Sequence, residues 1–297
     1  MLDPRLLYTF NPALWEQMRD RRPVLIHLLH GYVDAGQVSR TIADHILATC
    51  PSQLLVEFDH DQLHDYRSRR PMMVFDTDQW KSAEKFVLAM HLVTAPGGEQ
   101  FVLLSGPEPD TQWERATAAI VGLAQRLDVR LAVTSHGIPT GVPHTRPSLI
   151  TEYASRPDLI RSENPVWVGR IEIPGGFGAY LEFHLGQGGV DALGLAVNVP
   201  HYLSQAPFYQ AAVAGLNRIN EGTGLALPLG DLPDKAEKNL HEIGNEVATS
   251  EEVQQVVEQF ERQYDQAQSD GPLPSAEEIG AELERFLAEQ DRKDDDT

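Results

Sequence analysis

Short apolar runs recur along the first two hundred residues, and polar segments rich in turn-forming residues separate them. The runs cover residues 24–29, 53–58, 72–75, 86–93, 101–105, 129–134 and 193–199. Runs of this length between glycine and proline are typical of strands, and the central ones of strands buried on both faces. Apolar residues at helical spacing lie between several of them, at 37–49, 111–127 and about 206–221. The pattern therefore predicts an α/β fold, with a mixed central sheet flanked by helices.

Two local features refine this prediction. The turn-forming segment 94–100, Thr-Ala-Pro-Gly-Gly-Glu-Gln, predicts a hairpin between the runs on either side of it. Asp110 precedes the helix at 111–127 and is a plausible N-cap. The hairpin makes part of the sheet antiparallel, which is why we expect a mixed sheet.

The stretch around which the rest of the chain is organised is 23–36. Its apolar run ends in a glycine turn, His30-Gly-Tyr-Val-Asp-Ala-Gly36, and apolar residues at helical spacing follow from Val38 onward. In an open α/β sheet, ligands bind where the carboxyl ends of strands meet such turns. We expect this turn to form the floor of a pocket. The residues concerned are Gly31, Asp34 and Gly36.

Composition changes abruptly after the segment Leu227–Pro233. The formal net charge of the chain is −20, and residues 231–297 carry 20 Asp and Glu against 6 Lys and Arg. We predict an α/β body at 1–232 and an acidic helical extension at 233–297. One extension helix follows Ser250 with an apolar stripe through Phe260 and Tyr264, and a second begins at the capping box Ser275–Glu278. Each helix buries only one stripe, so we expect the pair to pack on the body or on a neighbouring subunit.

Charge and cysteine content exclude several classes of function. An acidic chain without a basic patch repels phosphate backbones, so neither nucleic-acid binding nor binding to anionic membranes is expected. A single cysteine, Cys50, excludes an intrachain disulfide and suits a reducing compartment. The N-terminal residues show no signal peptide, and no apolar run is long enough to span a membrane. We therefore expect a cytoplasmic protein.

Two loops that follow strands carry the candidate chemistry. In the first, Gly106-Pro-Glu-Pro-Asp110, the carboxylates of Glu108 and Asp110 suit general acid–base catalysis or a hard cation, or else form a helix cap and a proline turn. In the second, residues 136–147, three prolines restrict the backbone of a loop that also carries a proton carrier and an anion-binding fork. The candidate residues in the second loop are His136, His144 and Arg146.

A third segment, 59–71, combines acids, histidines and a basic trio. Its irregular spacing favours a solvated loop over a metal site. Arg67, Arg69 and Arg70 suit a phosphate or a carboxylate of an adjacent subunit. No nucleophile elbow, Walker loop, Cys-x-x-Cys or dinucleotide fingerprint occurs in the required context, so no cofactor and no metal are predicted. His27 and His30 lie on opposite faces of the predicted strand and are not a ligand pair.

In combination and in order, these motifs resemble the proteasome assembly chaperone family in its actinobacterial branch. The resemblance rests on Gly31–Gly36, Asp65–Pro71, Gly106–Asp110 with Trp113, Gly137–Pro139, Val142–Pro147, Val199–Tyr202 and Phe260–Asp265. It covers residues from about 20 to 290.

The resemblance implies a body like the purine nucleoside phosphorylase and hydrolase fold, a helical extension, and assembly into trimers or hexamers. Family members that assemble proteasome rings typically end in a hydrophobic-Tyr-x tail, whereas this chain ends Asp294-Asp-Asp-Thr297. The leading hypothesis is a homo-oligomeric interaction or assembly protein with a proteasome-related partner. The alternative hypotheses are an enzyme or binder of a nucleoside-like or phosphorylated ligand, and a module whose acidic extension recruits a basic partner. The enzyme hypothesis requires Glu108, Asp110 and His144 to converge on one cavity.

Overall fold

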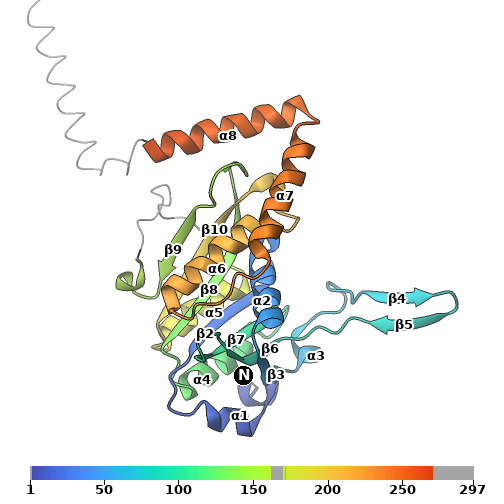
Figure 1. Cartoon of the computed structure of the whole chain (residues 1–297). Helices are drawn as coiled ribbons and strands as arrows, with labels where there is room; N and C mark the ends of the chain where they lie inside the picture. The colour runs from blue at the N-terminus through green and yellow to red at the C-terminus, as the bar shows by residue number, and fades with distance from the viewer. Residues whose placement is uncertain (1, 162–169, 171, 270–297) are drawn as a thin grey trace, which may run out of the picture.

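The computed structural model describes residues 2–161, 170 and 172–269, which form an α/β body followed by two long helices (Figure 1). The body is built on an eight-stranded mixed sheet of order β1-β3-β6-β7-β2-β8-β10-β9. Its strands are β1 (Tyr8–Phe10), β2 (Val24–His30), β3 (Ser52–Phe58), β6 (Ala89–Thr94), β7 (Gln100–Pro107), β8 (Leu131–Thr140), β9 (Ile150–Ala154) and β10 (Ala192–Pro200). The predicted α/β fold with a mixed sheet is confirmed.

Four adjacent strands, β7, β2, β8 and β10, run parallel, and antiparallel strands flank them on both sides. The segment 94–100 does connect an antiparallel pair, β6 and β7. Pairing between β2 and β8 is short: it begins at Val24↔Leu131 and ends at Ile26↔Val133, although β8 continues to Thr140. The two strands therefore separate toward their carboxyl ends.

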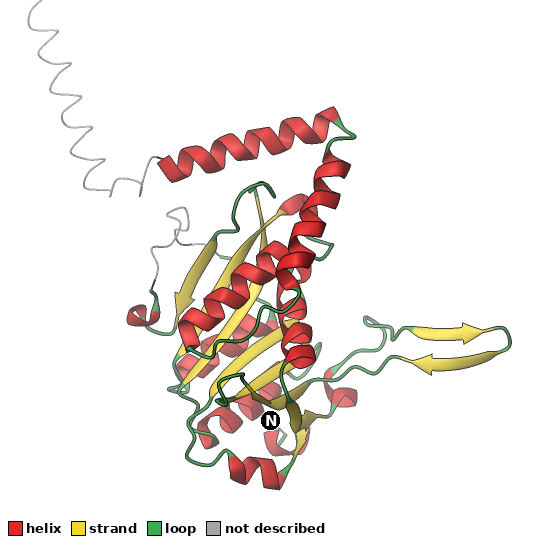
Figure 2. Cartoon of the chain, viewed as in Figure 1, coloured by secondary structure: helices red, strands yellow, loops and turns green. Residues whose placement is uncertain are grey.

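Helices cover both faces of the sheet (Figure 2). One face packs against α2 (Val38–Thr49) and α6 (Tyr209–Thr223), and the other against α4 (Trp113–Arg126) and α5 (Phe177–Gln187). Strand β2 shows why the sequence reads as one continuous apolar run. Ile26 and Leu28 enter the core on the α2 side, whereas Leu25 and Leu29 enter the core on the α4 side. Both faces of β2 are thus buried, as parallel strands require.

Helix α7 (Leu232–Val247) packs on α6, and α8 (Glu251–Ser269) then turns back across the edge of the body (Figure 1). The helix predicted from Ser275 lies outside the described residues. Within the described part of the chain, no helix has the length and apolarity needed to cross a lipid bilayer. Smaller elements complete the fold: α1 (Pro12–Gln17) and α3 (His60–Leu63).

A separate two-stranded hairpin, β4 (Met73–Asp76) and β5 (Gln79–Ala83), projects away from the body (Figures 1 and 2). All the residues of both strands are exposed. The sequence shows an apolar run at 72–75, and a run of this kind usually lies inside a sheet. Here it lies in solvent on an extension that the pattern does not reveal.

Candidate functional site at the carboxyl edge of the sheet

The carboxyl ends of β7, β2, β8 and β10 lie along one edge of the sheet, because these strands are parallel. The connections that leave this edge are 31–37, 108–112, 141–149 and 201–208. They contain most of the candidate residues from the sequence. The carboxyl edge is therefore the part of the fold where most of the predicted site residues lie.

Asp34 is a structural anchor of the turn after β2. Its Oδ1 accepts hydrogen bonds from the backbone N–H of Ser39, at 2.8 Å, and of Gly137, at 3.4 Å. Burial raises the pKa of the Asp34 carboxyl, although these hydrogen bonds act in the opposite direction. Asp34 thus ties the start of α2 to β8.

Gly36 has a φ of 67°, a left-handed conformation that favours glycine. Its N–H donates to the carbonyl of Ser204, and its own carbonyl accepts from the N–H of Phe208, both at 2.9 Å. The glycine turn is therefore fastened to the connection after β10. Its contacts are made by the protein backbone itself.

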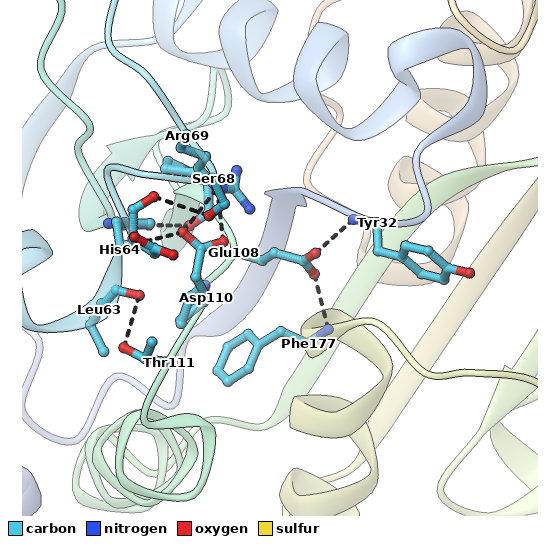
Figure 3. Close-up of polar contacts among 12 residues, drawn as sticks. Tyr32, Leu63, His64, Ser68, Arg69, Glu108, Asp110, Thr111 and Phe177 are labelled. Carbon is cyan, nitrogen blue, oxygen red and sulfur yellow. Dashed lines mark hydrogen bonds and ion pairs between the residues drawn. The ribbon is translucent and has the colours of Figure 1, made fainter.

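Glu108 accepts hydrogen bonds at both carboxylate oxygens (Figure 3). The N–H of Tyr32 donates to Oε1 at 2.6 Å, and the N–H of Phe177, at the start of α5, donates to Oε2 at 3.0 Å. The carboxylate fills the space beside Gly31, where a Cβ atom would lie 2.0 Å from the Glu108 Cδ. Glu108 is only 8% exposed, and it joins the turn after β2 to α5.

Asp110 does not cap α4, contrary to the prediction: the N-cap position is Gln112, in a left-handed conformation. The Arg69 guanidinium donates to the Asp110 carboxylate at 2.9 Å, and the N–H of Asp65 donates to its other oxygen, also at 2.9 Å. The Glu108 side chain extends toward Tyr32, whereas that of Asp110 extends toward Arg69 (Figure 3). The two carboxylates serve different parts of the fold.

His144 and Arg146 lie in the connection after β8. The hydroxyl of Tyr202 accepts from the His144 backbone N–H at 3.0 Å and lies 2.9 Å from the Nδ1 of the same residue. Burial lowers the pKa of His144. Among the described residues, no hydrogen bond or ion pair joins His144 to Glu108 or to Asp110.

Arg146 is engaged by α8. Its guanidinium binds Asp265 through two hydrogen bonds, at 2.8 and 2.7 Å, and contacts Glu261 at 3.3 Å. These pairings raise the pKa of the already basic arginine further. The predicted anion-binding fork is occupied by carboxylates of the same chain.

Two aromatic residues of α8 complete this contact. The Tyr264 hydroxyl donates to the carbonyl of Pro147 at 3.0 Å, and the Phe260 ring packs edge-on against His201. A Cβ atom on Gly141 would lie 3.3 Å from the Phe260 ring. The segment Phe260–Asp265, which carries part of the family resemblance, thus attaches α8 to the carboxyl edge.

Three other predicted residues lie apart from these contacts. Arg67 and Arg70 are exposed at the base of the β4–β5 hairpin. Gly106 has a φ of 131°, and a Cβ atom there would lie 2.1 Å from the Val87 carbonyl oxygen. Gly106 therefore allows β7 to approach the segment before β6 closely.

His136 is a strand residue of β8, and not part of a loop as predicted. Its ring lies 6.2 Å from that of Tyr153 on β9, and burial lowers the pKa of His136 to about 4. It belongs to a group of polar side chains beneath α5 that also includes His27 and Glu182. Sequence reasoning missed the other members of this group. The only signal was His27, a histidine inside an otherwise apolar run.

In the described ranges, no group of three or more His, Cys, Asp or Glu side chains is placed to hold a metal ion. A shallow groove between α4 and α5 is lined by Thr117, Tyr180 and His184, among others.

An eight-stranded mixed α/β body followed by C-terminal helices defines the class of protein to which this chain belongs. Proteins of known structure that are similar to the chain share this fold. The PAC2 family model matches residues 28–247, and the chain belongs to the PAC2 family. No protein with a curated description matches the chain.

Several solved structures of actinobacterial proteins are similar to this chain over most of its length. Rv2714 of Mycobacterium tuberculosis, a protein of unknown function, is 37% identical with a TM-score of 0.83, and the match covers 95% of this chain and 92% of that one. A protein of unknown function from Corynebacterium glutamicum is 32% identical with a TM-score of 0.80, covering 87% and 97%. Rv2125 of M. tuberculosis, a proteasome-assembly chaperone homologue, is 25% identical with a TM-score of 0.71, covering 79% and 99%.

Proposed function

We propose that this PAC2 protein is a homo-oligomeric interaction protein, a trimer or a multiple of a trimer, whose subunits are joined through the β4–β5 hairpin. The observation that carries the proposal is the exposure of this hairpin. Met72 is 76% exposed, Phe75 56% and Trp80 62%. Large apolar side chains gathered on a protruding element are typical of protein interfaces.

The hairpin also needs a neighbour for its own stability. An isolated two-stranded hairpin is marginally stable in water, and this one packs no face on the body. Its main internal contact is the cross-strand pair Phe75 and Trp80, with ring centroids 5.0 Å apart. Burial against another subunit supplies the apolar contacts that the hairpin lacks.

Charge favours a second copy of this chain as that neighbour. Residues 66–87 carry five Lys and Arg against three Asp and Glu, whereas the rest of residues 1–230 carries 13 Lys and Arg against 21 Asp and Glu. A weakly basic, apolar hairpin is complementary to an acidic body. Contact between the hairpin of one copy and the body of the next is head-to-tail, and such contacts form a ring when the rotation between successive copies closes.

A proteasome-related protein is the external partner that we propose for the assembled protein. The support is the likeness to Rv2125, a proteasome-assembly chaperone homologue, and membership of the PAC2 family.

The molar mass of the full chain in solution tests the oligomer. Light scattering after size exclusion should give three or more times the mass of the 33.0 kDa chain. The double variant Phe75→Ser/Trp80→Ser should shift the protein to the monomer mass, whereas Phe183→Ser, which removes an equally exposed phenylalanine from α5, should not. A monomeric wild type, or an oligomer unaffected by the hairpin variant, contradicts the proposal.

Capture experiments test the partner. Immobilised wild-type protein should retain purified proteasome subunits from an actinobacterium, and the hairpin variant should retain less if assembly is needed for binding. If the oligomer forms but purified proteasome subunits do not bind, the proposed partner is wrong and the oligomer stands.

A further inference from the structure

A row of polar side chains crosses the face of the sheet that α5 covers, where the surroundings are otherwise apolar. It begins at His27 on β2, continues through His136 on β8 and Tyr153 on β9, and ends at Glu182 on α5. His136 is close enough to His27 to lower its pKa. The rings of His136 and Tyr153 lie 6.2 Å apart, and the Tyr153 hydroxyl and the Glu182 carboxyl are close enough for each to shift the pKa of the other.

The backbone makes room for this row. Gly194 on β10 lies between β8 and β9, opposite Tyr153, and a Cβ atom on it would be 2.1 Å from the Tyr153 Cζ. A glycine is therefore required for the Tyr153 ring to lie across β10. His27 is the first residue after the end of the β2–β8 pairing, at the point where these two strands separate.

Several polar atoms of the row and its border have no hydrogen-bond partner among the described residues. They are both ring nitrogens of His27, Oε2 of Glu182, Oδ1 of Asn198 and Oγ1 of Thr151. His27 and Asn198 are 0% exposed, and Glu182 is 6% exposed. A buried polar group without a partner destabilises the fold, and such groups in native proteins usually bind a water molecule or a ligand.

These atoms also share one face of the sheet. Side chains two residues apart in a strand share a face of the sheet. Thr151 and Tyr153 therefore share one face of β9, and Asn198 lies on the same face of β10 as Gly194. His136 and Tyr153 are only partly buried, whereas His27 lies at full depth. The row therefore extends from partly exposed rings to a fully buried imidazole.

The row carries no charge at neutral pH. Burial raises the pKa of Glu182 to about 8, and it lowers the pKa of His27 to about 3 and that of His136 to about 4. No lysine or arginine of the described residues contributes to any of these shifts. A phosphate or carboxylate group has no cation to pair with here, so an anionic ligand is disfavoured.

We propose that His27, His136, Tyr153 and Glu182 form a binding site for a small uncharged molecule that carries hydroxyl or amide groups. A neutral carboxyl offers one O–H donor and one carbonyl acceptor, and a neutral imidazole offers one donor and one acceptor. Hydroxyl and amide groups of a ligand can both accept hydrogen bonds from these donors and donate hydrogen bonds to these acceptors. This site is independent of the proposed oligomer, because it lies inside one subunit.

Binding of simple probes to the full-length protein tests the site. Acetamide, 2-pyrrolidinone, glycerol and erythritol are the uncharged probes, and acetate and inorganic phosphate are the anionic ones; ligand-observed NMR titrations give the Kd of each. We expect at least one uncharged probe to bind, with neither anion binding. Glu182→Leu and His27→Leu should each weaken that binding at least tenfold.

Two further variants distinguish a neutral site from a charged one. Glu182→Gln keeps an uncharged donor and acceptor and should bind within about threefold of wild type. Glu237→Gln, at an exposed position on α7, is the matched control and should not change the Kd. If a leucine variant does not fold, Tyr153→Phe removes a single hydroxyl and should still weaken binding severalfold.

Three results would overturn the proposal. The first is that no uncharged probe binds the folded wild type. The second is that probe binding survives His27→Leu, Glu182→Leu and Tyr153→Phe. The third is that acetate or phosphate binds and His27→Leu or Glu182→Leu abolishes that binding, because the row would then hold an anion.

Discussion

The buried carboxyl of Glu182 makes the stability of this protein depend on pH in a predictable direction. In the folded chain its pKa is raised to about 8, mainly by burial, whereas in the unfolded chain it returns to the ordinary value of 4.5. Between these two values, the folded state holds a proton that the unfolded state has released. The free energy of unfolding therefore falls as pH rises through this window, and it levels off above the folded pKa.

The variant Glu182→Gln isolates this effect, because an amide of nearly the same shape does not titrate. One pKa unit corresponds to about 1.4 kcal/mol, and the last unit below the folded pKa contributes less than its full share. From pH 6 to pH 8, the free energy of unfolding of the wild type should fall by about 2 kcal/mol relative to that of the variant. Tyr153 stays protonated over this range, because its own pKa is raised well above 10.

Urea unfolding at pH 6, 7 and 8 measures the difference, with the concentration of protein held constant. The variant Glu237→Gln, which removes an exposed carboxylate, should follow the wild type in parallel at every pH. If the curves of wild type and Glu182→Gln are also parallel, Glu182 does not carry an extra proton in the folded state. The reasoning about the polar row beneath α5 would then be refuted.

Three further substitutions test the carboxyl edge. Glu108→Ala leaves two buried N–H groups without an acceptor and should lower the free energy of unfolding by about 3 kcal/mol in urea; an unchanged midpoint contradicts the bridging role. Gly31→Ala places a methyl group against the same carboxylate and should cost about 1–3 kcal/mol, and the cost should shrink in a Glu108→Ala background, where the clash is gone. Arg146→Ala removes the ion pairs to α8, so amide hydrogen exchange in α8 should accelerate while exchange in α6 stays the same. An equal change of the exchange rate in both helices would contradict the idea that Arg146 holds α8 on the body.

The sequence predicts the body of the fold well where burial on two faces or one face produces a distinct pattern. Strand β2 is the clearest case, since residues that enter two different cores give an unbroken apolar run. Helix α4 buries one face and shows the expected spacing. In these elements the local pattern and the tertiary contacts agree.

Elements without such a pattern were missed. Helix α5 contains three glycines within or at its end, Gly178, Gly186 and Gly188, which made its sequence resemble flexible turns. Strand β4 shows the opposite failure, because the apolar run at 72–75 looks like a buried strand but lies on an exposed hairpin. Sequence pattern reports how apolar a segment is, and it does not report which surface covers the segment.

The sequence predicts a candidate site at the carboxyl edge of the sheet, but it does not predict which groups bind its side chains. The carboxyl edge is rich in polar residues, as expected, but Glu108, Asp110 and Arg146 are bound to groups of the same chain. The polar row beneath α5 brings together His27 and Glu182, which are far apart in the sequence. Their proximity depends on strand order, and one sequence does not specify strand order.

The central position of β2 has a consequence for biosynthesis. This strand leaves the ribosome well before its two neighbours, β7 and β8, which lie at residues 100–107 and 131–140. At about 5–20 residues per second, β2 waits on the order of 5–20 s before both edges of it can be paired. Throughout that interval, the apolar segment Val24–Leu29 is exposed on the nascent chain. During its own synthesis, the chain therefore presents an apolar segment that lacks its second partner strand until residues 131–140 have emerged.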